Sequence, residues 1–112
     1  PRYTVVAEKF EAIVSLGMAN SRLKDYFDLW VLLSTQALDV DMLQKAIAAT
    51  LARRQTPMPA STPIGFSHAF GDDSQKIKQW NAFLQKNQLQ APPLHSVVAL
   101  LREKLLSKQP LQ

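Results

Sequence analysis

The segment "TPMPASTPIG", residues 56–65, contains three prolines and cannot be helical, because proline removes a helical hydrogen bond and clashes with the preceding turn. Helical periodicity is present on both sides of it, over residues 4–55 in front and 66–108 behind. Its length suits a strap across one surface better than a linker between two domains. We therefore expect residues 1–112 to form a single helical domain.

Apolar residues recur at helical spacing in the front part and predict three helices, at 4–16, 21–34 and 40–54. The residues suited to end or begin these helices are Gly17, Asn20, Ser21 and Asp39. The side chains expected in the core are Val6, Phe10, Ile13 and Val14, then Leu23, Tyr26, Phe27 and Trp30, then Leu43, Ile47 and Leu51.

The back part predicts a fourth helix that ends near Asn87 and a fifth that begins at Pro93, a residue favoured in a first helical turn. "FSHAF", residues 66–70, is expected to form a single turn. Strand signals are absent, since no segment alternates and no Asn-Gly or Asp-Gly hairpin turn occurs. The fold expected is an all-α compact bundle of about five helices. The candidate caps of the fourth helix are Asp72, Asp73 and Ser74.

Composition excludes several classes of protein. There is no cysteine, so disulfides, thiolate metal sites and a cysteine nucleophile are excluded. No apolar run approaches 18 residues and no signal peptide is evident, so we expect a cytoplasmic protein with no membrane partner. The net charge of +4 is scattered along the chain and favours anionic partners only weakly. Because the chain starts at Pro1, we interpret it as a fragment of a longer polypeptide.

The segment "NSRLKDYFDLW", residues 20–30, places charges inside a core-forming helix. With the aromatic residues of this helix turned to the core, Asp25 points away from it, together with Arg22, Asp28, Leu29 and Leu32. A solvated face would not normally continue into two leucines, so this second face is expected to meet a partner surface. The alternative to a functional second face is that Lys24 and Asp28 form an ordinary solvated ion pair at positions i and i+4.

Lys9 stands out in the first helix because it lies at the edge of the apolar stripe rather than on the polar face of Glu8, Glu11 and Ser15. A lysine there must reach water, pair with an acid, or bind an anion of a ligand. Asp25 or Asp28 of the second helix is the candidate acid.

Other polar groups are interpreted as structural. "DVD" at 39–41 and "GDDS" at 71–74 are predicted helix caps rather than metal ligands. His68 and His95 have no neighbouring ligand set, so no metal site is predicted. A diffuse RNA-facing patch would form if the helices brought together Arg53, Arg54, Lys76 and Lys78.

The stretch "VVAEKFEAIVSLGMANSRLKDYFDLWVL", residues 5–32, resembles the C-terminal signature of the AbiEii-type nucleotidyltransferases, the toxins of abortive-infection toxin–antitoxin systems. The resemblance lies in an "AEK" helix, a short loop and the pattern R-x-K-D-x-x-D-L. "TLARRQTPMP" at 50–59 and W-x-x-F-L at 80–84 also fit the tail of that family.

The resemblance implies a two-lobed protein with a helical C-terminal lobe and an N-terminal lobe that carries a Gly-Ser turn followed by an Asp-x-Asp metal pair. It implies that Lys9 contacts the nucleotide phosphates and that Asp25 is the acid across the cleft, both as catalytic residues. Arg22, Lys24 and Asp28 belong to the same nucleotide-binding motif. Mg²⁺, a nucleoside triphosphate, an antitoxin and an RNA acceptor such as tRNA are implied for the complete protein.

The sequence departs from the family pattern in one respect: it holds no Gly-Ser turn followed by Asp-x-Asp. The N-terminal catalytic lobe is therefore absent, and the chain alone is expected to bind neither cofactor and to be inactive. The alternative is a free-standing, non-catalytic helical module. In one form of it, the face of Leu29 and Leu32 docks a partner such as the antitoxin.

Overall fold

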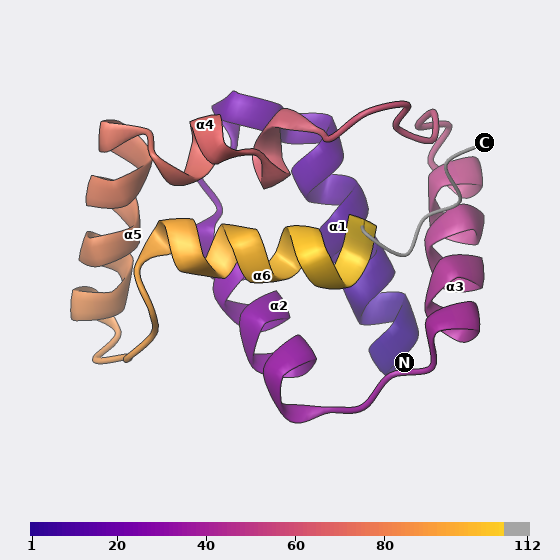
Figure 1. Cartoon of the computed structure of the whole chain (residues 1–112), viewed down its shortest axis with the longest axis horizontal. Helices are drawn as coiled ribbons and strands as arrows, with labels where there is room; N and C mark the ends of the chain where they lie inside the picture. The colour runs from indigo at the N-terminus through magenta and orange to yellow at the C-terminus, as the bar shows by residue number, and fades with distance from the viewer. Residues whose placement is uncertain (107–112) are drawn as a thin grey trace.

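Helices account for all the regular structure in the computed structural model, which describes residues 1–106 (Figure 1). No strand occurs in that range, so the prediction of an all-α fold is confirmed. The predicted back part extended to residue 108, and its last two residues lie outside the described range. The elements are α1 (Arg2–Leu16), η1 (Gly17–Ala19), α2 (Leu23–Thr35), α3 (Val40–Arg53), η2 (Ile64–Phe66), α4 (His68–Gly71), α5 (Ser74–Lys86) and α6 (Leu94–Leu106).

The predicted helix ends agree with the structure where a side chain or a glycine determines them. Asp39 accepts a hydrogen bond from the N–H of Met42 at 2.9 Å, and Asp73 accepts one from Lys76 at the same distance. Gly17 ends α1 with a φ of 55°, a conformation that favours glycine. The short acidic motifs at 39–41 and 71–74 are therefore helix caps, as predicted.

The loop between α1 and α2 and the segment after the strap were incompletely predicted. Asn20 does not cap α2; its Oδ1 accepts from the N–H of Arg22 at 2.7 Å, so α2 begins only at Leu23. "FSHAF" forms parts of two short helices, η2 and α4, rather than one turn, because the hydroxyl of Ser67 accepts from the N–H of Phe70 and starts α4.

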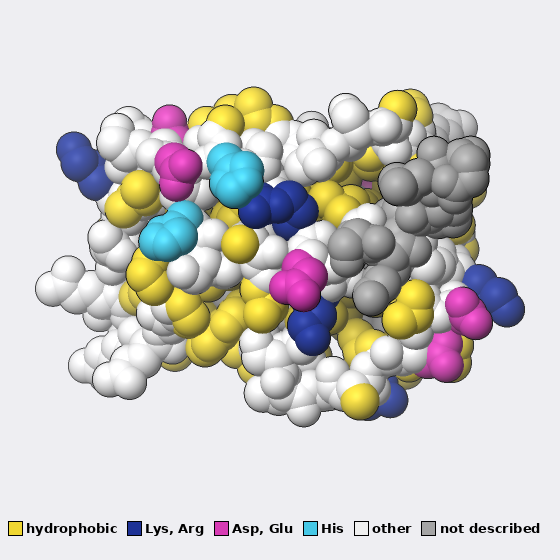
Figure 2. Space-filling view, viewed as in Figure 1, with side chains coloured by type: hydrophobic (Ala, Val, Ile, Leu, Met, Phe, Trp, Pro, Cys, Tyr) yellow, Lys and Arg dark blue, Asp and Glu magenta, His cyan; other side chains and the backbone are white. Residues whose placement is uncertain are grey.

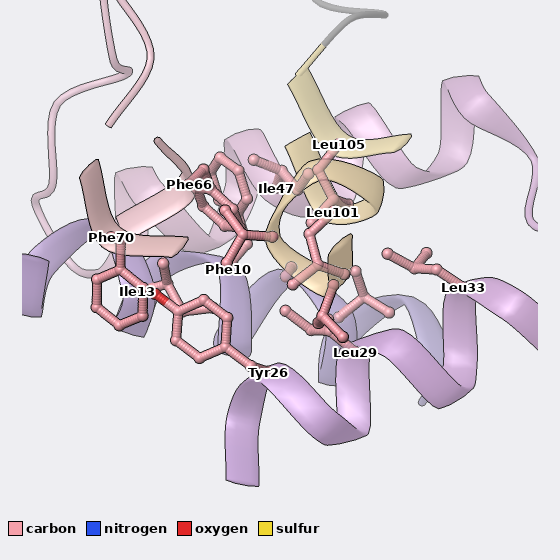
Figure 3. Packing of buried hydrophobic residues seen from close by; sticks show 14 of the residues in the cluster. Phe10, Ile13, Tyr26, Leu29, Leu33, Ile47, Phe66, Phe70, Leu101 and Leu105 are labelled. Atoms are coloured by element: carbon pink, nitrogen blue, oxygen red, sulfur yellow. The ribbon is translucent and has the colours of Figure 1, made fainter. Parts of the chain in front are cut away.

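The core forms where α6 crosses the middle of the molecule, while α3 and α5 lie at opposite ends of it (Figure 1). α1 packs most extensively against α3, and α6 packs against α2 and α4. Aromatic and branched side chains from these helices meet in one cluster (Figure 3). The largest fully buried side chains include Trp80, Tyr26, Phe10, Phe66, Phe70 and Ile13.

The rotation of α2 differs from the prediction. Leu29 is fully buried and points into the core with Tyr26 and Leu33, whereas Phe27 and Trp30 are only half-buried (Figure 3). The helix is apolar around most of its circumference, so its periodicity did not specify which side would face inward. A docking face that includes Leu29 is therefore excluded, because this side chain already packs within the chain.

The segment of η2 joins the front and back parts of the chain. The hydroxyl of Tyr26 donates to the carbonyl of Gly65 at 2.7 Å in a buried hydrogen bond. Phe66 stacks on Phe10 with ring centroids 5.2 Å apart. A Cβ on Gly65 would lie 2.6 Å from Cγ2 of Ile13 and 3.1 Å from the Tyr26 hydroxyl, so only glycine fits without displacement of its neighbours.

No helix among the described residues is long and apolar enough to cross a bilayer.

We predict that Gly65→Ala lowers the free energy of unfolding by about 2 kcal/mol, because the added methyl group overpacks a buried contact with the side chain and carbonyl of Ile13 and the hydroxyl of Tyr26. Urea denaturation of both proteins measures the change. Ser61→Ala, at an exposed position of the same strap, is the matched control and should be nearly neutral. An unchanged stability of Gly65→Ala would contradict the close packing described above.

Candidate functional site

Lys9 of α1 lies against two acids of α2. Its Nζ is 3.1 Å from Oδ1 of Asp25 and 3.1 Å from Oδ2 of Asp28. The two acids are three residues apart on α2, so both reach the same side of the helix. Of the three alternatives that the sequence left open for Lys9, the structure shows pairing with an acid of the second helix, and Lys9 pairs with both candidates.

Two further cations complete this group, which we call the Lys9 cluster: Lys9, Arg22, Lys24, Asp25 and Asp28. Nε of Arg22 is 3.4 Å from Oδ2 of Asp25, and Nζ of Lys24 is 2.7 Å from Oδ2 of Asp28. The side chains of Arg22 and Lys24 are mostly exposed. All the residues that the sequence predicted for the nucleotide-binding motif therefore lie together.

Asp25 is the buried member of the cluster. Its side chain is 5% exposed, against 21% for Lys9. The sequence placed Asp25 on a face turned away from the core, whereas the structure buries it at the core's edge. Its Oδ2 accepts no hydrogen bond from the described part of the chain and has only the ion pair with Arg22. The carboxylate of Asp25 therefore lies between two cations, Lys9 and Arg22.

Opposing effects act on the ionisation of the cluster. Burial lowers the pKa of Lys9, but the hydrogen bonds and charges of Asp25 and Asp28 outweigh it and hold this pKa above its ordinary value. Burial raises the pKa of Asp28, and the contacts with Lys24 and Lys9 reverse that effect and lower it. Both groups are therefore charged at neutral pH.

A groove of about 550 Å³ runs along α1 beside the cluster. On the side nearer α2 the groove is lined by Lys9, Asp25 and Arg22, and on the side nearer α3 it is lined by Glu8 and Arg54. The exposed apolar side chains of Val5 and Leu16 also border it. The ammonium of Lys9 is thus reachable from a concave surface of mixed charge.

A second charged group on the opposite flank of α1 joins it to the end of α3. Arg53 and Arg54 both pair with Glu8, the latter through a contact of 2.7 Å between its guanidinium and Oε1. Glu11 accepts hydrogen bonds from the hydroxyls of Ser15 and Thr56 and lies 3.7 Å from Nε of Arg54. These contacts stabilise the packing of α1 on α3 next to the groove.

Sequence reasoning missed this second group. It found the shared polar face of Glu8, Glu11 and Ser15 but not its partners, because the partners lie about 45 residues further along the chain. The sequence feature that could have indicated these partners is the adjacent pair Arg53 and Arg54, two residues before Thr56. Two carboxylates on one helix face opposite two adjacent arginines would have suggested the pairing.

The helices do not bring Arg53, Arg54, Lys76 and Lys78 together, so the conditional basic patch does not form. The two arginines pair with Glu8 at the end of α3, while Lys76 is buried on α5 at the opposite end of the molecule (Figure 1). Figure 2 shows the face that carries both histidines, where cationic and acidic side chains are scattered. No group of three histidine, aspartate or glutamate residues within residues 1–106 is arranged to hold a metal ion.

We predict that Glu11→Gln destabilises the chain by on the order of 1–2 kcal/mol at pH 7, because the charge-assisted hydrogen bonds of Glu11 are weakened. Burial raises the pKa of Glu11, but Ser15, Thr56 and Arg54 outweigh it and lower this pKa below 4.5. The stabilisation is therefore complete above pH 4.5 and is lost as the pH falls through the folded-state pKa.

Urea unfolding of the parent chain and Glu11→Gln between pH 7 and pH 3 measures this difference. The gap in unfolding free energy should narrow below about pH 4.5. Asp72→Asn, at an exposed acid, serves as the control and should leave only a small gap throughout. A gap for Glu11→Gln that stays constant down to pH 3 would refute the assigned ionisation.

Comparison with known protein families identifies a match. The family model described as "Nucleotidyl transferase AbiEii toxin, Type IV TA system" matches residues 1–103, which include both charged groups on α1. Neither the curated proteins nor the solved structures give a match. The family implies a nucleotide substrate and, as part of a toxin–antitoxin system, an antitoxin partner. Since the match covers almost the whole chain, this protein belongs to the AbiEii family of nucleotidyltransferase toxins.

Proposed function

We propose that this chain is the C-terminal helical lobe of an AbiEii nucleotidyltransferase and that the Lys9 cluster lines the cleft in which the nucleotide binds. The observation that carries the proposal is the lysine of α1 held by two carboxylates of α2 at the edge of a groove. The all-helical fold is consistent with it. So is the sequence, which holds no Gly-Ser turn followed by Asp-x-Asp.

Lys9 would contact the phosphates of the nucleotide. Its ammonium carries three N–H donors, and the contacts with Asp25 and Asp28 leave a donor for a further anion. Because those carboxylates keep the pKa of Lys9 high, the charge is present whenever the nucleotide arrives. Phosphoryl transfer is accelerated chiefly by positioning and by neutralisation of charge, which is work that a fixed ammonium can do.

Asp25 would act by orienting the two cations beside it. Its carboxylate contacts Lys9 at 3.1 Å and Arg22 at 3.4 Å, so it can hold both toward one ligand. Arg22 and Lys24 remain exposed and can extend the contact to a longer anion. That extension supports an RNA acceptor such as tRNA, whose phosphates continue beyond the reacting end.

These residues do not fit a bound Mg²⁺. The two carboxylates of the cluster each have the ammonium of Lys9 at 3.1 Å, and no third acidic or histidine ligand joins them in the described range. Under this proposal the metal ligands belong to the N-terminal lobe. The residues of this chain would bind and orient the nucleotide without coordinating the metal.

We predict that Lys9→Ala and Asp25→Ala each lower nucleotidyl transfer by the complete toxin at least about 100-fold, because each removes a fixed charge from the cleft. Transfer of labelled nucleotide to total tRNA measures the activity. Lys45→Ala removes an exposed lysine of α3 and should leave activity near that of the parent. Circular dichroism of each variant establishes that the helices remain folded.

Two results would overturn the proposal. One is transfer that survives both substitutions in folded protein, which would make the Lys9 cluster structural. The other is a native polypeptide that starts at or near Pro1, as measured by intact mass from the source cells. A native product longer by about 100 residues or more at its N-terminus would leave room for the other lobe and support the proposal.

A further inference from the structure

Lys76 is a buried lysine outside the Lys9 cluster. It lies in the first turn of α5, and only 6% of its surface is exposed. Its Nζ donates to the main-chain carbonyl of Asn20 at 2.6 Å, across 56 residues of sequence, and to Oε1 of Gln79 at 3.4 Å. The ammonium also lies 5.5 Å from the ring centroid of Phe70. No carboxylate within residues 1–106 forms an ion pair with it.

A lysine in this place needs an explanation, because burying an ammonium away from water without a carboxylate partner is unfavourable. A methionine of similar volume would avoid that cost. What the lysine provides, and an apolar side chain would not, is a strong, directed hydrogen bond to the carbonyl of Asn20. Such a bond constrains the main chain at Asn20.

The backbone constrained by Lys76 leads into the Lys9 cluster. Asn20 is 1% exposed and lies in the loop between α1 and α2. Its N–H donates to the carbonyl of Gly17 at 3.1 Å, and its Oδ1 accepts from the N–H of Arg22 at 2.7 Å. The carbonyl of Arg22 in turn accepts from the N–H of Asp25 at 3.0 Å. One chain of hydrogen bonds thus links Lys76 to the start of α2.

A second path of contact reaches the same turn of α2. The ring of Phe70 stacks on that of Tyr26, with centroids 4.8 Å apart, and Tyr26 directly follows Asp25. The ammonium of Lys76 lies 5.5 Å from the centroid of the same Phe70 ring. The first turn of α2 is therefore supported from α5 both through its backbone and through its aromatic side chain.

We propose that Lys76 is a positioning residue, which fixes the loop between α1 and α2 and thereby holds Asp25 and Asp28 at their distance from Lys9. Its importance for nucleotidyl transfer rests on the function proposed above. Its effect on the geometry of the Lys9 cluster does not, and it is measurable in the chain itself.

The experiment compares Lys76→Met with Lys78→Met, which removes an exposed lysine two residues further along the same helix. The ammonium of Lys9 is titrated by NMR in the parent chain and in both variants. In Lys76→Met the pKa of Lys9 should fall toward its ordinary value of 10.5, because Asp25 and Asp28 are no longer held in place. In Lys78→Met the titration of Lys9 should match the parent.

This readout separates positioning from general stability. A residue that only stabilised the fold would lower the melting temperature and leave the titration of Lys9 unchanged in the folded variant, and that result would overturn the proposal. If Lys76→Met does not fold, Lys76→Gln keeps a neutral donor of shorter reach and is judged by the same criterion. Lys76→Arg retains a cationic donor, so the pKa of Lys9 in this variant should lie closer to the parent value than in Lys76→Met.

The complete toxin gives the second readout. Lys76→Met should lower kcat/KM for nucleotidyl transfer by on the order of tenfold or more, since small displacements of a catalytic group are costly, while Lys78→Met should not. The two proposals fail in different ways. If Lys9→Ala abolishes transfer but Lys76→Met leaves the titration of Lys9 unchanged, only the positioning role fails. If Lys76→Met shifts that titration but Lys9→Ala retains full transfer, only the proposed function fails.

Discussion

The close approach of Gly65 to α1 and α2 determines how the two parts of this chain fit together. The proline-rich strap returns the backbone to the front part at η2, where the Gly65 carbonyl accepts the hydrogen bond of Tyr26 and leaves no room for a side chain against Ile13. Phe66 and Phe70, which follow Gly65 in the chain, then stack on Phe10 and Tyr26 respectively. Because Tyr26 follows Asp25, the packing of the core and the position of the Lys9 cluster depend on the same contact.

α1 carries a different charged group on each flank, and the groove runs between them. Toward α2, Lys9 is the cation and two aspartates are its partners. Toward the end of α3 the signs are reversed, since Glu8 faces two arginines. In each group, charges of α1 pair with opposite charges of the neighbouring segment at a site that is only partly solvated. These ion pairs hold α1 on both flanks, where its surface is not purely apolar. That arrangement leaves polar side chains next to the groove, where a ligand can reach them.

Much of the fold follows from local pattern, whereas the site depends on contacts that local pattern does not contain. Helical spacing and the caps Asp39 and Asp73 determine where α3 and α5 begin, and Gly17 ends α1 as expected. The inward turn of Leu29 was missed because α2 is apolar on several sides, and packing against α6 selects among them. Pairing with Asp25 or Asp28 was among the alternatives for Lys9, because a lysine at the edge of an apolar stripe must reach water, an acid or an anion of a ligand. The partners of Glu8 and Lys76 lie 45 to 56 residues away in sequence, beyond the reach of any periodic signal.

The net charge of the Lys9 cluster offers a reason why, under the proposed function, this chain would need a second lobe to bind the nucleotide. Three cations, Lys9, Arg22 and Lys24, face two carboxylates, Asp25 and Asp28, so the cluster has a small excess of positive charge. An approaching phosphate gains from that excess but must compete with two carboxylates already bound to Lys9. Phosphate binding at a partly exposed site of this kind is weak in water, where such charges are well screened. A second surface that excludes water and carries further positive charge would strengthen the binding of the phosphate to these cations. Under the proposed function, an N-terminal lobe with its metal ion would provide that surface, and the carboxylates would keep Lys9 charged and oriented until the two lobes enclosed the nucleotide.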